Sequence, residues 1–182
     1  MGAKSKAYLV EFNKLKTGLN EFSFVLDDKF LQDFEYSPFE SANIEVALKL
    51  TKTETLYDLK FHFKGLVKVV CDTCTEDIDL PIDEKFGLIM RLSEANNFED
   101  SEIIYIARTE IEYDLKQYLY ESMLLAVPQR KSCDDLPDPK PCNEEVLKKL
   151  ATVEKIEEDD DDDDDEPEND DPRWNKLKDL LN

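Results

Sequence analysis

The chain has 182 residues, with 44 acidic and 23 basic side chains, a net charge of −21 and a single histidine, His62. A chain this negative repels nucleic acid unless its basic residues gather locally, and one histidine without a glycine-rich phosphate loop disfavours an enzyme. No apolar run approaches the length of a membrane helix and no export signal follows Met1, so we expect a cytosolic protein whose thiols stay reduced.

The first half of the chain alternates apolar and polar residues with a period of two, which is typical of half-buried strands. Asp27 predicts the N-cap of a short helix, and 52–54 predicts the turn of a hairpin. Gly65 interrupts one of the alternating runs and predicts a bulge or a sharp bend there. The expected extended segments are 7–15, 21–26, 44–50, 57–63, 66–70, 78–82 and 86–92.

The pattern changes in the second half of the chain. The short apolar run 103–107 predicts a buried strand. Thr109 and Glu112 have the spacing of a capping box, and apolar residues then recur with helical spacing as far as Pro128, so we expect one helix over this stretch. Segment 143–154 predicts one or two further helical turns.

Four cysteines, in two pairs, are the main chemical feature of the chain. Cys71 and Cys74 form a C-x2-C motif at the tip between two expected strands, where a tight turn points both sulfurs the same way. Cys133 and Cys142 border a proline-rich stretch, 129–141, that we expect to be an irregular loop. Together the two pairs could supply four thiolates to one tetrahedral zinc ion. Metal-free buried thiols and a redox-sensing pair remain open as alternatives.

The acidic charge is concentrated near the end of the chain. Of the 44 acidic residues, 13 lie between Glu157 and Asp171, a stretch without basic residues. Such a run repels itself and cannot bury apolar surface, so it predicts a disordered linker over 157–170. We expect 1–156 to form one α+β domain, with a mainly antiparallel β-sheet or partly open barrel and a few helices.

The last segment, 171–182, regains an amphipathic pattern. Asp171 is a good N-cap, Pro172 suits the first helical position, and Trp174 and Leu177 fall on one helical face. An amphipathic peptide on a solvated tether is typical of a docking element. The predicted partner-binding residues are Arg173, Trp174 and Leu177.

Five sequence features occur in an order that matches a known family. They are Gly18 with Asn20-Glu21-Phe22-Ser23-Phe24, Phe63-Lys64-Gly65-Leu66-Val67 leading into Cys71-Asp72-Thr73-Cys74, Tyr113-Asp114-Leu115 with Glu121, Leu124-Leu125-Ala126-Val127-Pro128, and Asp171-Pro172-Arg173-Trp174 with Leu177. In these features, which span most of the chain, the protein resembles the YceD family of bacterial large ribosomal RNA subunit accumulation proteins. The resemblance implies a role in the synthesis, processing or stability of large-subunit (23S) ribosomal RNA, and it implies no known catalytic activity.

The chain departs from the family pattern near its cysteines. Thr73 and Thr75 stand where family members usually have an arginine and an apolar residue. Cys133 and Cys142 are eight residues apart, whereas the later cysteines of many relatives are closely spaced. The resemblance therefore supports the first cysteine pair more strongly than the second.

These observations favour a non-enzymatic ribosome assembly factor that binds a basic ribosomal protein or a large-subunit assembly intermediate. An acidic chain attracts basic partners, so we expect its effect on RNA to be indirect, and we expect neither a membrane nor a small-molecule substrate as partner. Two alternatives stay open. One is an RNA-processing or modifying enzyme, for which Asp77, Asp79 and Asp83 would be the candidate carboxylates because they lie close together in the sequence. The other is a redox- or zinc-dependent regulator.

Overall fold

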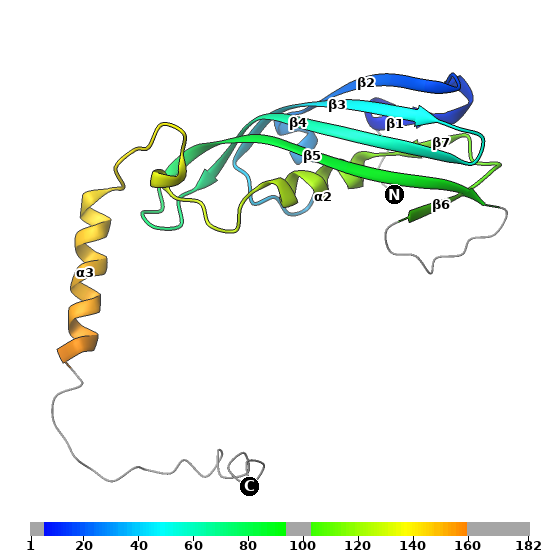
Figure 1. The fold of residues 1–182 in the computed structure, drawn as a ribbon. Coiled ribbons are helices and arrows are strands. Elements are labelled where there is room, and N and C mark those ends of the chain that lie inside the picture. The colour runs from blue at the N-terminus through cyan, green and yellow to red at the C-terminus, as the bar shows by residue number, and fades with distance from the viewer. Residues whose placement is uncertain (1–5, 94–102, 160–182) are drawn as a thin grey trace, which may run out of the picture. The chain divides into compact units, whose positions relative to one another are not determined.

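The computed structural model describes residues 6–93 and 103–159, and the chain divides into two compact units, Met1–Cys142 and Asn143–Asn182. The first unit contains an open five-stranded sheet in the order β2-β3-β4-β5-β6 (Figure 1). Neighbouring strands are antiparallel except β5 and β6, which are parallel. The strands are β2 (Gly18–Leu26), β3 (Ser41–Lys52), β4 (Leu56–Val70), β5 (Asp77–Ser93) and β6 (Ile103–Ala107). The α+β prediction with a mainly antiparallel sheet is confirmed.

Alternating apolar residues bury one face of this sheet. Val46 and Leu48 of β3 lie opposite Phe63 and Phe61 of β4, and all four are at most 1% exposed. Because strand side chains alternate between faces, the residues between them point to the other face. The expected hairpin is confirmed: Thr53 closes its turn by donating its backbone N–H and hydroxyl to the carbonyl of Leu56.

One face of the sheet is covered by α2 (Lys116–Ala126), as Figure 1 shows. Tyr118 of this helix packs on Phe61, with 4.9 Å between ring centroids, and donates its hydroxyl to the carbonyl of Gly87. Leu119 and Met123 are fully buried. The smaller elements of the unit are η1 (Lys6–Tyr8), β1 (Leu9–Glu11), η2 (Phe12–Lys14), α1 (Asp28–Leu31), β7 (Glu112–Asp114) and η3 (Cys133–Asp135). The extended segment expected at 7–15 is therefore a strand only in its centre.

Of the two helix starts predicted for this unit, the structure confirms one and contradicts the other. Asp27 caps α1 as expected, because its carboxylate accepts two backbone N–H groups of the first turn. The capping box at Thr109 and Glu112 is wrong. Glu112 lies in β7, which pairs with β1, and this tertiary pairing holds the segment extended. The helix begins at Lys116, whose N–H donates to the carboxylate of Asp114 at 2.9 Å.

The bulge expected at Gly65 is also wrong. β4 runs without interruption through Gly65, which pairs with Ile44 of β3 and Ile82 of β5. A Cβ atom at this position would lie 2.1 Å from the carbonyl oxygen of Asn43. The glycine therefore permits a close approach of two strands, rather than a break in one of them.

In the second unit the structure describes one helix, α3 (Glu144–Asp159), which is longer than the turn or two expected over 143–154. The side chain of Asn143 accepts the N–H of Glu145 at its start. The predicted docking residues Arg173, Trp174 and Leu177 lie outside the described residues. Over residues 6–93 and 103–159, no helix is long and apolar enough to cross a membrane.

Candidate metal centre

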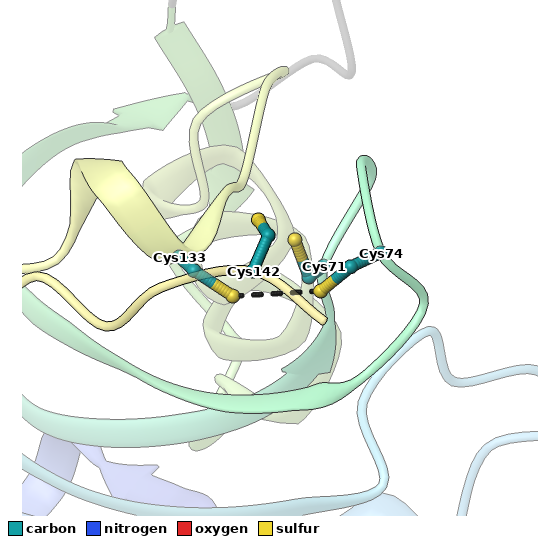
Figure 2. Close-up of side chains that lie close together, drawn as sticks. All are labelled: Cys71, Cys74, Cys133 and Cys142. Carbon is teal, nitrogen blue, oxygen red and sulfur yellow. Dashed lines mark hydrogen bonds between the residues drawn. The ribbon is translucent and has the colours of Figure 1, made fainter. Parts of the chain in front are cut away.

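The turn between β4 and β5 presents the first cysteine pair, as the sequence predicts. The N–H of Cys71 donates to the carbonyl of Glu76 at 2.8 Å, and the N–H of Thr75 donates to the carbonyl of Cys71 at 3.0 Å. Thr75 has a φ of 61°, a left-handed conformation that β-branched residues rarely adopt. These contacts hold a strained, tight turn in which Cys71 and Cys74 point to the same side (Figure 2).

The second cysteine pair lies in a loop that closes on itself. Cys133 begins η3, where the hydroxyl of Ser132 donates to the carboxylate of Asp135 at 2.7 Å. The N–H of Lys140 then donates to the carbonyl of Cys133 at 3.2 Å. This bond folds the segment back so that Cys142 returns to the side of Cys133. The proline-rich loop is irregular, as expected, but its hydrogen bonds give it a defined geometry.

A clamp between Asp72 and Lys131 joins the two segments. The N–H of Asp72 donates to the carbonyl of Lys131, and the N–H of Lys131 donates to the carboxylate of Asp72, both at 2.8 Å. The ammonium group of Lys131 reaches the other carboxylate oxygen at 2.9 Å. The hydrogen bonds from Lys131 lower the pKa of Asp72. Sequence reasoning missed both residues, because only the fold brings them together across the 59 positions that separate them.

The clamp brings all four cysteines into one cluster, shown in Figure 2. Their sulfurs all lie within 4.8 Å of one another, and those of Cys74 and Cys133 are 3.6 Å apart. Four thiolates bound to one zinc ion at about 2.3 Å in a tetrahedron would be about 3.8 Å apart. Cys71 is fully buried, and Cys142, the most exposed of the four, is 9% exposed. The donor set and its spacing fit a closed, structural zinc site.

The thiols differ in their electrostatic surroundings. Burial raises the pKa of Cys71, but hydrogen bonds to its sulfur from the backbone of Cys74, Thr73 and Cys133 outweigh this effect and lower it to about 6. Burial raises the pKa of Cys133 and of Cys142. Backbone N–H groups aimed at a buried sulfur favour its thiolate form, which is the form that binds metal. The thiols of Cys133 and Cys142 would need a cation nearby to ionise.

The carboxylates of the enzyme alternative do not form a comparable site. Within residues 6–93 and 103–159, the cysteine cluster is the only group of three or more Cys, His, Asp or Glu side chains close enough to share an ion. Asp77, Asp79 and Asp83 are exposed along β5. The carboxylate of Asp83 instead lies 2.6 Å from the ring nitrogen Nε2 of His62, and this hydrogen bond lowers the pKa of Asp83.

Comparison with known proteins gives one match. Residues 59–181 match the model of a protein family described as "Large ribosomal RNA subunit accumulation protein YceD". The matched range contains all four cysteines and the candidate docking residues at 173, 174 and 177. No curated protein and no solved structure matches the chain.

Proposed function

The chain belongs to the YceD family, because the family model matches well over half of its length. From this membership we propose that the protein is a non-enzymatic, cytoplasmic factor that supports the synthesis, processing or stability of large-subunit ribosomal RNA. The observation that carries the proposal is the family match itself, whose description names the accumulation of that RNA.

We further propose that the four cysteines hold a structural zinc ion. The support is their burial, their mutual spacing and the N–H groups directed at the sulfur of Cys71. The ion would supply positive charge to the thiolates and tie the β4–β5 turn to segment 131–142. Because all four positions would be filled by protein ligands, such a site stabilises the fold and leaves no open position for catalysis.

The partner that best fits the charge of the chain is a basic ribosomal protein or a large-subunit assembly intermediate. Thirteen acidic residues between Glu157 and Asp171 would attract such a partner over long range. Arg173, Trp174 and Leu177 follow directly and would provide an anchor for the bound state. In this proposal the acidic segment speeds association with the partner, and the anchor slows dissociation from it.

A redox switch is the second candidate. It is favoured by the 3.6 Å separation between the sulfurs of Cys74 and Cys133, which a small movement would shorten to a disulfide bond. The metal content of protein purified under reducing conditions separates the two readings, since a zinc site retains its metal and a dithiol switch binds none.

Depletion of the protein from growing cells tests the proposed function. We expect mature large-subunit RNA to fall relative to small-subunit RNA, and we expect the wild-type protein to restore the ratio. A depleted strain that expresses the double variant Cys71→Ser, Cys74→Ser, compared with one that expresses the wild-type protein, shows whether the cysteine cluster is needed. Unchanged RNA ratios after depletion, at several growth temperatures, would contradict the proposal.

A further inference from the structure

The face of the main sheet opposite α2 contains a hollow of about 530 Å³ that is rich in basic side chains. Such a cluster is unexpected in a chain with a net charge of −21. The residues that line this basic hollow are Ala47, Lys49, Lys60, Phe61, His62, Lys85, Phe86 and Gly87.

The strand register places two lysines opposite each other in the basic hollow, and it places a histidine opposite a third lysine. Lys49 of β3 pairs directly with Lys60 of β4, and His62 of β4 pairs directly with Lys85 of β5. Like charges in directly opposed positions destabilise a sheet. A bound anion would offset this repulsion, so the arrangement has a physical reason if the hollow binds one.

Neighbouring acids neutralise these lysines only in part. Lys49 lies 3.9 Å from Glu21, and Lys60 lies 3.4 Å from Asp58. The side chains of both lysines are more than 60% exposed, and ion pairs as exposed as these contribute little energy. Both ammonium groups can therefore turn toward a ligand at small cost.

Small residues keep the floor of the basic hollow open. Gly87 and Ala47 lie between the lysines, flanking β4 on its two sides. A Cβ atom at Gly87 would come no closer than 4.0 Å to its nearest neighbour, the carbonyl oxygen of Leu59. The backbone at this position thus does not require glycine. The effect of the glycine is to leave room among the basic side chains.

The positive charges continue in a line along β4. Lys64 and Lys68 follow Lys60 and His62 on the same face, and alternate residues of a strand are about 6.8 Å apart. Glu45 and Asp83 lie opposite Lys64, as Glu21 lies opposite Lys49, so acids compensate part of the positive charge along the row. A row of cations suits a linear polyanion better than a single small anion.

We propose that the basic hollow binds the phosphate backbone of RNA, with Lys49, Lys60 and Lys85 contacting phosphates. The choice of RNA over another polyanion rests on the proposed function, since the description of the matched family names ribosomal RNA. The proposal adds a direct RNA contact to a role for which the overall charge of the chain suggests only an indirect one.

Binding of a fluorescent oligouridine of about twelve nucleotides to the full-length protein tests the proposal. Three phosphate contacts predict that the logarithm of the affinity falls with that of the salt concentration with a slope of about −2. The triple variant Lys49→Gln, Lys60→Gln, Lys85→Gln should lose at least about tenfold in affinity at low salt and most of that slope. The matched control replaces the exposed lysines 16, 29 and 140 with glutamine, and it should bind almost as the wild type does.

A second variant separates shape from charge. Gly87→Leu fills the basic hollow without changing any charge, and it should weaken RNA binding while the unfolding temperature and the metal content stay those of the wild type. Absence of RNA binding by the wild type at low salt, or equal losses in the lysine triple variant and its control, would overturn the proposal. Equally effective competition by polyglutamate would overturn the choice of RNA. None of these outcomes alters the RNA ratio in depleted cells, which tests the proposed function separately.

Discussion

Replacing Gly65 with alanine tests the packing that leads β4 to the cysteine turn. The added Cβ atom would lie 2.1 Å from the carbonyl oxygen of Asn43 and 2.7 Å from the Cα atom of Ile44. Both neighbours are backbone atoms of β3 and cannot rotate away, so this strand would have to shift by about 1 Å to restore ordinary contact distances. Such a shift disrupts the hydrogen bonds of the central strand pair.

The expected loss of stability is about 3 kcal/mol, at the upper end of the usual range for overpacking. With a urea dependence of about 2 kcal/mol per M, the unfolding midpoint should fall by roughly 1.5 M. Urea titration followed by far-ultraviolet circular dichroism measures this change. Gly87→Ala is the matched control, because the same added atom meets only ordinary contacts there and should leave the protein unchanged or more stable by about 0.5 kcal/mol.

An unfolding midpoint for Gly65→Ala equal to that of the wild type would refute the reasoning. It would mean that β3 does not approach Gly65 as closely as the register of the sheet requires. A fall in the midpoint at Gly87 as large as that at Gly65 would point instead to a general intolerance of side chains in these strands.

Three further predictions concern the metal, the clamp and the tail. Reduced wild-type protein should contain about one zinc ion per chain, and the Cys142→Ser variant should contain well below one. In that variant, amide hydrogen exchange should be faster than in the wild type in residues 131–142 but not in β3. Metal-free wild-type protein would contradict this prediction. Lys131→Met should raise the pKa of Asp72 only part of the way to the ordinary carboxylate range, because the backbone N–H of residue 131 still donates to this carboxylate. Because the pKa of Asp72 is lowered in the folded wild-type protein, the clamp should stabilise the fold at neutral pH and lose this effect only as the pH falls through that pKa. A carboxyl-carbon NMR titration measures the pKa in both proteins. Trp174→Ala should speed dissociation from the captured partner, whereas neutralising residues 159–165 should slow association and remove most of its salt dependence; identical binding kinetics in both variants would exclude recognition by the tail.

Much of the fold follows from local patterns. The strands around Val46 and Phe61 could be predicted because one buried face imposes a period of two on the sequence. The cap at Asp27 and the position of the C-x2-C turn are equally local, since each depends on a few neighbouring residues.

The wrong predictions share a cause, which is contact between distant segments. Residues 112–114 carry a capping signal, yet pairing with β1 holds them extended. Gly65 looks like a break in a strand, and only the position of β3 shows that it permits a close approach. Neither contact can be predicted from the residues that are neighbours in the sequence.

The cysteine site lies between these cases. The sequence indicates Cys71 and Cys74 through their spacing, but Cys133 and Cys142 have no spacing that predicts a shared site. Their meeting depends on hydrogen bonds within the loop and on the clamp between Asp72 and Lys131. Asp72 is exposed and Lys131 is half-buried, and nothing in the local sequence distinguishes either from other charged surface residues.

The most direct test of the central claim is affinity capture of the intact protein from growing cells, with bound proteins and RNA identified together. A role in large-subunit assembly predicts that large-subunit ribosomal proteins and precursors of large-subunit RNA are recovered in excess over small-subunit components. Capture from cells that express the tag alone provides the control. Recovery of a metabolic enzyme alone, without ribosomal components, would contradict the account.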